Sequence, residues 1–412
     1  MDDIFLIFTM ITFVIVLSYK YYKYNYNLLL RLSFWFIIFY FFYFLYAALC
    51  LDSFSVNDRF YFSKDTITKT KYLVSSLGII LIAIFSQLTF PSVDDLIFYR
   101  PVKIVSYLAF FIILSSFVIF SVSLKNLITL YKSFGKTFNY MEYRVALEQI
   151  RAKSHIKILV YMLLAVDYFY CIPEKKFKYL IKIDFFLAMA FDFISGTRTV
   201  LFLIVLYQYI ITIRRRKNSY IVFMLIISCV VLFSSEIIRS IGLNLEKSNS
   251  SIPEKILLGI GEFNNSLVTL PYIIEGRIEP SFDLIDLISW ANFIPPLIRF
   301  FNKSNLGDIY QISINRGIGY ASNIVSNWYY ISGICCVFFI TIFFLLFIYF
   351  DKKTYKGEFF LLKILMICFV RNFMREGIAS FMTFIYIFVV YFGVFILLNK
   401  QNRRFLCINC KH

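Results

Sequence analysis

The sequence is poor in charged residues and in the residue types that build most soluble enzyme sites. Only 16% of its 412 residues are charged, and two are histidine. It contains no His-Glu-x-x-His pattern, no Gly-x-Ser-x-Gly pattern and no cluster of metal-ligating residues, so neither metal-dependent hydrolysis nor serine acyl transfer is indicated. The eight cysteines are scattered and show no disulfide framework. We therefore expect neither a cofactor nor a metal.

What the chain has in abundance is apolar side chains. Hydrophobic residues make up 60% of it, and the mean hydropathy is +0.74. A soluble domain is about half apolar and about a quarter charged, so this composition predicts a polytopic membrane protein. The first apolar run has no basic residues before it and no small-residue cleavage site after it. We expect it to be a retained span and not a signal peptide.

Apolar runs that approach the length of a membrane span, about 20 residues, recur along the chain. They lie at Ile4–Leu17, Leu28–Cys50, Tyr72–Phe90, Ile104–Leu124, Ile158–Ile172, Tyr179–Ile194, Val200–Ile213, Tyr220–Phe233, Tyr329–Phe350, Phe359–Val370 and Ile378–Leu398. The sequence therefore predicts an all-α transmembrane bundle of about 11–12 spans. Its regions would be an N-terminal bundle (1–235), a large outer loop (236–328), and C-terminal spans with an inner tail (329–412).

Basic residues beside the apolar runs assign a side to each loop, because Lys and Arg hold loops on the cytoplasmic side. The strongest cluster runs from Arg214 to Lys217, and Lys20–Lys23, Lys175–Lys176, Asp351–Lys353 and Lys400–Arg404 agree with it. We therefore predict an outer N-terminus and an inner C-terminus. The predicted outer segments are 51–71, 125–157, 195–199, 236–328 and 371–377. Much of the net charge of +17 reflects this topology, and the remainder is available to an anionic ligand.

One segment, Lys125–Lys157, conflicts with the rule because it is basic and yet predicted to be outside. Two interpretations remain open. Either one span is miscounted, or this segment lies outside because it binds something anionic. It also contains His155, which we interpret as a solvated histidine, with a proton-accepting role as the alternative.

A short turn, Ser195-Gly196-Thr197-Arg198, is the first candidate site. It precedes a predicted helix at the outer surface, where backbone N–H groups and a guanidinium together favour an anion. The alternative is that Arg198 reaches to lipid headgroups. Asp192, inside the preceding span, is close enough to pair with Arg198. We favour that structural ion pair, with a catalytic carboxylate as the alternative.

Further candidates lie on the outer side. The long outer loop carries Arg239, Glu262 and Arg316, and is too apolar to be a free linker. Half-buried helices over the bundle suit it better. Arg371 and Arg375 are predicted in a tight outer turn, on one face if that turn is helical. Two like charges there need a partner, either a polyanion, which we favour, or Glu376 with lipid headgroups.

The order of these pieces resembles a known family. The Ser-Gly-Thr-Arg turn is followed by an apolar run and a basic cluster, and the outer loop contains Gly261-Glu262-Phe263. Arg316-Gly-Ile-Gly-Tyr-Ala-Ser-Asn323 then leads into Asn327-Trp-Tyr-Tyr330, and Arg371-Asn-Phe-Met-Arg375 precedes the last span. This layout resembles the bacterial O-antigen polymerases, also called oligosaccharide repeat unit polymerases. The resemblance covers most of the chain in layout and residues from about 190 to 380 in local pattern.

The resemblance implies a metal-independent membrane glycosyltransferase of the bacterial inner membrane, acting in polysaccharide biosynthesis. Such an enzyme joins repeat units carried on undecaprenyl diphosphate at the periplasmic face, which would make 236–328 a periplasmic loop. The implied partners are the lipid-linked repeat units, the bilayer and a chain-length regulator membrane protein, with no nucleic acid.

The resemblance also implies roles for particular residues. Its arginine in the Ser-Gly-x-Arg turn corresponds to Arg198, and the one near Gly-x-Gly corresponds to Arg316. Arginines at these places would stabilise charge on the departing diphosphate. We expect Arg198, Arg316 and Arg371 to contact the diphosphate, followed by Arg239 and Arg375, with Glu262 or Asp192 as the base. Where members of that family often have a carboxylate, this chain has Ser322 and Asn323, a departure that argues against a base there.

Three alternatives remain. An O-antigen ligase uses the same donor and differs in its acceptor. A flippase or exporter of lipid-linked oligosaccharide would carry charges along a central path through the bundle, whereas the clearest arginines here are predicted outside. A non-catalytic membrane subunit would have no need of a long ordered outer loop.

Overall fold

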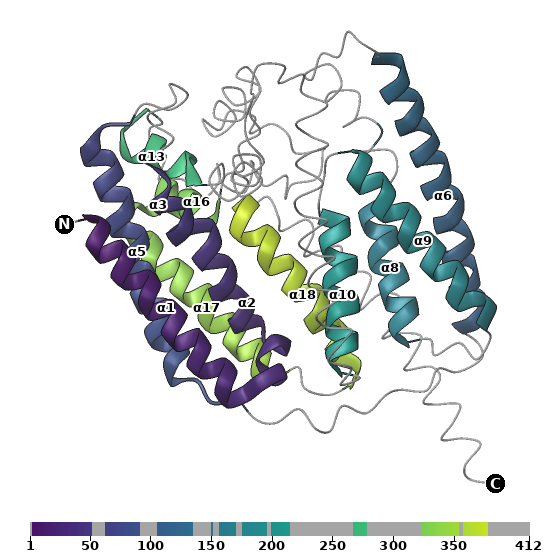
Figure 1. The fold of residues 1–412 in the computed structure, drawn as a ribbon, viewed down its shortest axis with the longest axis horizontal. Coiled ribbons are helices and arrows are strands. Elements are labelled where there is room, and N and C mark those ends of the chain that lie inside the picture. Colours follow the sequence, from purple (N-terminus) through teal and green to yellow (C-terminus); the bar gives the residue numbers. More distant parts are fainter. Residues whose placement is uncertain are drawn as a thin grey trace. The chain divides into compact units, whose positions relative to one another are not determined.

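The computed structural model describes residues 2–51, 62–90, 105–134, 150, 156–169, 175–195, 199–214, 267–277, 323–353 and 357–377. Within these ranges every regular element is a helix, which confirms the predicted all-α class for this part of the chain (Figure 1). The helices group into two compact units. The first comprises Met1–Asp95, Ile260–Tyr355 and Met366–Phe384, and the second comprises Leu96–Gly259, Lys356–Leu365 and Ile385–His412. The three regions predicted from chain order stay a prediction.

Several of these helices are long and apolar enough to cross a membrane. They are Asp3–Tyr24, Leu32–Leu49, Lys64–Gln87, Ala109–Leu130 and Ile324–Lys352. Large apolar side chains on them are exposed, for example Phe8 in the first and Phe338 in the last, as lipid-facing side chains are. The described structure fits a multi-pass membrane protein. The predicted spans Tyr220–Phe233 and Ile378–Leu398 lie outside the described residues.

The first unit is built from an N-terminal group of helices and a second group from the later chain. The first group is α1 (Asp2–Tyr24), the 3₁₀ helix η1 (Asn25–Leu30), α2 (Leu32–Tyr40), the π-helical η2 (Phe41–Tyr46), α3 (Ala47–Leu49) and α5 (Lys64–Gln87). The second is α13 (Thr269–Ile274), α16 (Ile324–Ser332), η4 (Gly333–Cys335) and α17 (Cys336–Lys353). Helix α18 (Gly357–Glu376) contributes its C-terminal half to this unit.

Helices α1, α5 and η2 pack closely at one glycine. A Cβ at Gly78 of α5 would lie 3.2 Å from Cγ2 of Thr9 and 3.3 Å from Cδ2 of Leu45. Beside it, the rings of Phe13 and Tyr40 stack with centroids 6.2 Å apart. A residue without a side chain lets helix backbones approach, which is how apolar helices gain contact where lipid is as apolar as the helix surface.

One end of the first unit is organised by Asp351, near the end of α17. Its carboxylate accepts hydrogen bonds from the backbone N–H groups of Leu32 and Ser33, both at 2.8 Å, and from the Ser33 hydroxyl at 2.7 Å. The carboxylate thereby caps the N-terminus of α2. Lys20 of α1 donates to the Leu88 carbonyl, just after α5. We call residues 20–33, 88–90 and 351–353 the Asp351 end.

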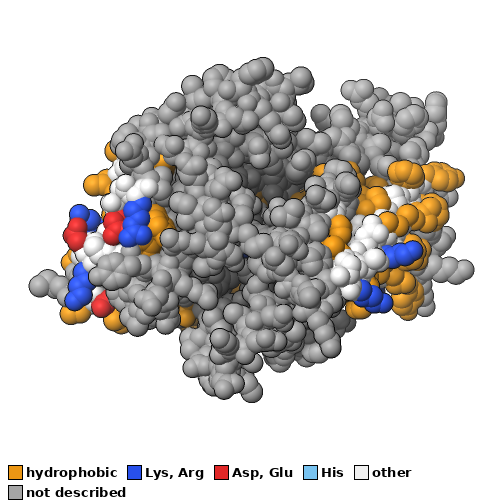
Figure 2. Space-filling model, turned by 90° about the horizontal axis from the view of Figure 1, so that it is seen from above, with side chains coloured by type: hydrophobic (Ala, Val, Ile, Leu, Met, Phe, Trp, Pro, Cys, Tyr) orange, Lys and Arg blue, Asp and Glu red, His pale blue; other side chains and the backbone are white. Residues whose placement is uncertain are grey.

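The opposite end gathers the starts of α1, α5 and α16 with α13. Ser63 caps α5 by accepting from the Thr66 N–H at 3.2 Å. Lys71 pairs with Asp3 at 2.6 Å, which ties α5 to the start of α1. We call residues 2–3, 63–71, 269–277 and 323–326 the Ser63 end. Figure 2 shows the molecule of Figure 1 from above. Acidic and basic side chains lie side by side on the first unit, at the left of that view.

The predicted single span Tyr329–Phe350 is wrong in one respect, because the helix is broken. Helix α16 ends at Ser332, a 3₁₀ turn covers Gly333–Cys335, and α17 begins at Cys336. Gly333 has φ +56°, a backbone conformation that glycine adopts without strain. The Ser332 hydroxyl donates to the Trp328 carbonyl at 2.7 Å, a bond that competes with helix continuation.

The second unit contains α6 (Val105–Phe134), α8 (Ile156–Phe169), α9 (Lys175–Ile194) and α10 (Thr199–Arg214), together with the N-terminal half of α18. Helices α8 and α10 are joined by a hydrogen bond from the Tyr207 hydroxyl to Asp167 at 2.7 Å. The predicted runs that correspond to these four helices are confirmed as helical. Helix α6 continues to Phe134, so the beginning of the basic segment Lys125–Lys157 is helical and not a loop.

Candidate functional site

The structure describes some of the predicted site residues and not others. Asp192, Arg371 and Arg375 lie within the described chain, in α9 and α18. The remaining candidates, Arg198, Arg239, Glu262 and Arg316, lie outside the described residues.

Asp192, near the end of α9, caps the N-terminus of α10. It is buried, and its Oδ2 accepts hydrogen bonds from the N–H groups of Val200 at 2.9 Å and Leu201 at 3.0 Å. Ser195 closes the turn by donating its hydroxyl to the Asp192 carbonyl at 3.0 Å. A carboxylate at a helix N-terminus satisfies N–H groups that have no partner within the helix.

This cap occupies part of the anion site that the sequence predicted at the N-terminus of α10. The prediction left the first N–H groups of α10 for an anionic ligand, but at Val200 and Leu201 they bind the protein's own carboxylate. An acidic side chain on the preceding helix is therefore the anion at these two groups. The predicted ion pair between Asp192 and Arg198 stays a prediction.

The predicted turn at 371–377 is wrong, because Arg371 and Arg375 lie on a helix. Helix α18 continues through both arginines to Glu376. Only then does the chain turn, at Gly377 with φ +58°. The prediction that these two arginines share a face when helical therefore applies, since residues four apart are neighbours on a helix surface.

The depth of Arg371 follows from its aromatic neighbour. Two residues away, the Phe373 ring packs on Phe343 at 5.1 Å and on Phe347 at 6.1 Å, both in the middle of α17. This part of α18 therefore lies beside the middle of α17 and not at either of its ends. Arg371 is only 4% exposed, and Arg375 is half-buried. Arg371 Nη1 lies 3.5 Å from the Asn372 side-chain oxygen.

A third cation lies on the same helix. Lys363 is only 3% exposed. Lys363, Arg371 and Arg375 are separated by eight and then four residues, which spreads them over about a third of the circumference of α18 and about 18 Å of its length. We call these three residues the α18 stripe. Cations buried within membrane helices are costly and usually mark a ligand or ion path.

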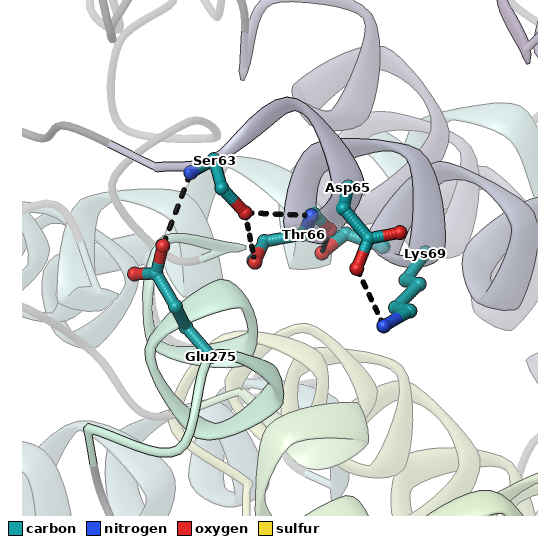
Figure 3. Close-up of polar contacts among 6 residues, drawn as sticks. Ser63, Asp65, Thr66, Lys69 and Glu275 are labelled. Atoms are coloured by element: carbon teal, nitrogen blue, oxygen red, sulfur yellow. Dashed lines mark hydrogen bonds and ion pairs between the residues drawn. The ribbon is translucent and has the colours of Figure 1, made fainter.

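The Ser63 end holds a second group of polar residues, which sequence reasoning did not assemble. Glu275, just after α13, accepts a hydrogen bond through Oε1 from the Ser63 N–H at 3.1 Å (Figure 3). Its Oε2 pairs with Arg277 Nε at 2.6 Å. Gly276 between them has φ +74°, a turn that suits glycine and brings the two side chains together.

Arg277 also lies against aromatic rings. Its guanidinium carbon is 5.5 Å from the centroid of Phe62 and 5.2 Å from that of Tyr272, within cation–π range. The side chain is nevertheless 42% exposed. The Glu275-Gly276-Arg277 motif was visible in the sequence, but its partners Phe62 and Ser63 are more than two hundred residues away. An oriented, partly exposed guanidinium of this kind can donate to sugar hydroxyls or phosphate oxygens.

Beneath this group, a buried hydrogen-bond network joins α13 to α16. Asn323 caps α16 by accepting from the Ser326 N–H at 2.7 Å. Its amide nitrogen donates to Thr269 Oγ1 at 3.3 Å, and Thr269 donates to the Ser326 hydroxyl at 2.9 Å. Asn323 is thus a helix cap. The network fixes the start of α16 against α13.

Among the described residues, no three His, Cys, Asp or Glu side chains lie close enough to hold a metal ion. In comparisons with known proteins, the chain matches no protein-family model, no curated protein and no solved structure.

Proposed function

We propose that this protein polymerises undecaprenyl-diphosphate-linked oligosaccharide repeat units into O-antigen or a similar surface polysaccharide, at the periplasmic face of the bacterial inner membrane. The observation that carries the proposal is the α18 stripe. Arg371, in the first unit, and Lys363, in the second, are each almost fully buried, and the described chain contains membrane-length apolar helices. A lipid that carries a diphosphate combines negative charge with a hydrocarbon tail, and so matches cations held within the bundle.

In this reaction the acceptor hydroxyl oxygen forms a bond to the anomeric carbon of the donor glycan. The bond from that carbon to the diphosphate breaks, and the diphosphate leaves with the electron pair. The hydroxyl proton passes to a carboxylate base. Arginine side chains stabilise the charge that grows on the leaving oxygen, and no metal is needed for that step.

We assign the roles within this proposal as follows. Arg371 and Arg375 bind the diphosphate together with Arg198, Arg239 and Arg316. Because Asp192 Oδ2 already caps α10, Glu262 is the better base of the two candidates. Arg277, held on Phe62 and Tyr272 at the Ser63 end, is available to bind sugar hydroxyls.

The test is the surface-glycan pattern of a deletion strain supplied with variants. Wild type should restore a ladder of repeats, and the deletion should leave a lipid core carrying a single repeat. Arg371→Ala should lower polymerisation by about 10²–10³-fold, the usual effect of losing one group that stabilises developing charge. Arg371→Lys keeps the charge and should retain part of the activity. Lys69→Ala, an exposed lysine on α5, is the control for general effects.

Protein abundance must be measured alongside, because Arg371 is buried. If Arg371→Ala is as abundant as wild type and still makes a full ladder, the assigned role is wrong. If the deletion leaves no repeat on the core, the polymerase proposal itself fails. Long lipid-linked polymer accumulating in that strain would indicate a ligase.

A second candidate function is a flippase or exporter of the same lipid-linked oligosaccharide. The observation that favours it is the spread of the α18 stripe over several depths, about 12 Å from Lys363 to Arg371. Asp184, in the middle of α9, adds a fully buried carboxylate whose oxygens have no hydrogen-bond partner in the described part of the chain. A transporter would leave the core bare and trap repeat units on the cytoplasmic side.

A further inference from the structure

The Asp351 end concentrates basic side chains around two aromatic rings. Lys20 Nζ lies 5.7 Å from the Tyr24 ring centroid and 6.0 Å from that of Phe90. Lys23 Nζ lies 5.4 Å from Tyr24, and the Arg31 guanidinium carbon 5.1 Å from Phe90. Three cations from α1 and the start of α2 are therefore held within a few ångströms of the same two rings.

The burial of these cations differs. Arg31 is 0% exposed and Lys20 is 3% exposed, whereas Lys23 is exposed. Buried charges raise the local positive potential because little water screens them. The two ammonium groups that share the Tyr24 ring repel each other, and an anion placed near Lys23 relieves that repulsion.

Charge at this end is unbalanced within the described residues. The described side chains of residues 20–33, 88–90 and 351–353 include Lys20, Lys23, Arg31 and Lys352, against the carboxylate of Asp351. That carboxylate already accepts three hydrogen bonds from the start of α2. Among the described residues, this group therefore has a net positive charge, which an anion from outside the protein would complement.

The location identifies the kind of anion. The C-terminal ends of α1, α5 and α17 lie here, together with the start of α2. Each of these helices belongs to a candidate membrane span. Exposed Tyr21 and Tyr22 lie between Lys20 and Lys23 along α1, and tyrosine is enriched where a bilayer meets water. The ends of apolar helices lie at the level of lipid phosphates, and basic groups there attract anionic headgroups.

From this arrangement we infer that the Asp351 end binds the headgroup of an anionic phospholipid. The lipid phosphate lies against Lys23, and Lys20 and Arg31 contribute charge from behind the Tyr24 and Phe90 rings. The inference does not depend on the proposed reaction, because the lipid here is a structural ligand and not a substrate.

The test uses the full-length protein in nanodiscs of phosphatidylcholine alone or of phosphatidylcholine with phosphatidylglycerol. Native mass spectrometry of protein released from the mixed discs measures retained phosphatidylglycerol, and intrinsic fluorescence measures Tm in each disc. Wild type should retain phosphatidylglycerol and show a higher Tm in the mixed discs. Lys23→Gln should weaken retention about fivefold, and adding Lys20→Gln should weaken it about fivefold again.

The matched control is Lys64→Gln/Lys69→Gln, which removes two exposed lysines from the Ser63 end. It should retain phosphatidylglycerol as wild type does. Because Lys23 is exposed, the single variant keeps the test decisive even if Lys20→Gln destabilises the fold. Equal retention by Lys23→Gln and wild type would overturn the inference, and so would an equal loss in the control. If inorganic phosphate raises Tm equally in phosphatidylcholine discs, the site binds free phosphate and the lipid assignment is wrong.

Discussion

At the Ser63 end of the first unit, basic side chains form close ion pairs with carboxylates, whereas at the Asp351 end they lie over aromatic rings, with the Asp351 carboxylate near Arg31. Lys69 pairs with Asp65, Lys71 with Asp3 and Arg277 with Glu275, each at 2.6 Å. At the Asp351 end, the cations lie over Tyr24 and Phe90, and Lys20 donates to Leu88. One end is close to neutral and the other is basic.

This difference bears on which way the chain crosses the membrane. The structure puts Lys20–Lys23 and Asp351–Lys353, both predicted inside from sequence, at one end of the same unit. It puts the start of α5 and Glu275, both predicted outside, together at the other end. Helix packing and loop charge are independent signals, and here they group the same segments. The basic end is the one that the positive-inside tendency assigns to the cytoplasm.

The largest expected effect is an all-or-none difference in labelling from outside the cell. A membrane-impermeant maleimide should label Lys64→Cys, at the Ser63 end, in intact cells. It should label Lys23→Cys, at the Asp351 end, only after permeabilisation. Wild type labelled in parallel gives the background, because native Cys335 is exposed. The reverse pattern would invert the orientation, and labelling of both positions in intact cells would contradict a two-sided unit.

The next effect is on stability and should separate the two ends. Asp351→Ala removes the cap of α2, leaving the N–H groups of Leu32 and Ser33 without their acceptor and Arg31 without the nearby carboxylate. Breaking a buried charged contact of this kind costs about 3–5 kcal/mol. Asp65→Ala, which removes an exposed pair within one helix, should leave the unfolding free energy unchanged. Unfolding of both variants in detergent, followed by helical circular dichroism, measures the contrast. A small loss in Asp351→Ala would mean that water replaces the cap.

Sequence reasoning located most of the described helices, because the length of an apolar run is a local property. It failed where a distant partner decides the structure. The carboxylate that caps α2 comes from Asp351, more than three hundred residues along the chain, and no local pattern shows that pairing. The group formed by Ser63 and Glu275 was missed for the same reason.

Charged residues inside helices misled the prediction in α18. Arg371 and Arg375 suggested a loop, since charge is expected at the ends of spans. In the structure, Phe373 between them packs on the middle of α17, so this part of the chain is a helix packed within the first unit. The break at Gly333 was missed because the whole stretch 324–352 is apolar, and hydropathy does not detect a change of backbone direction. A glycine beside serine was the one available signal.

A smaller effect is expected at the contact between Lys71 and Asp3. Lys71 is nearly buried while Asp3 is largely exposed, so Asp3→Asn removes a charge from one side of a half-desolvated pair. We expect a loss of about 1–2 kcal/mol, less than for Asp351→Ala, because water reaches Asp3. The measurement is the same detergent unfolding, repeated at high salt. If the loss equals that of Asp351→Ala, the two ends do not differ in how strongly they hold their charges.

A smaller effect on stability than at Asp3 is expected at Glu275, although its effect on function can be larger. Glu275→Gln keeps an oxygen that can accept from the Ser63 N–H but removes the charge that pairs with Arg277. Because Arg277 is 42% exposed, the stability loss should be about 0.5–1 kcal/mol and should shrink as salt is added. Arg277→Lys is the companion variant, since a lysine keeps the charge but not the planar fork. If Arg277 orients sugar hydroxyls, both variants should shorten the glycan ladder while remaining as abundant as wild type. Charge-removing variants at the two ends can then be compared by the glycan ladder. If those at the Ser63 end shorten the ladder and those at the Asp351 end do not, the ion pairs at the Ser63 end are part of the functional surface. Their role is then more than keeping that end uncharged.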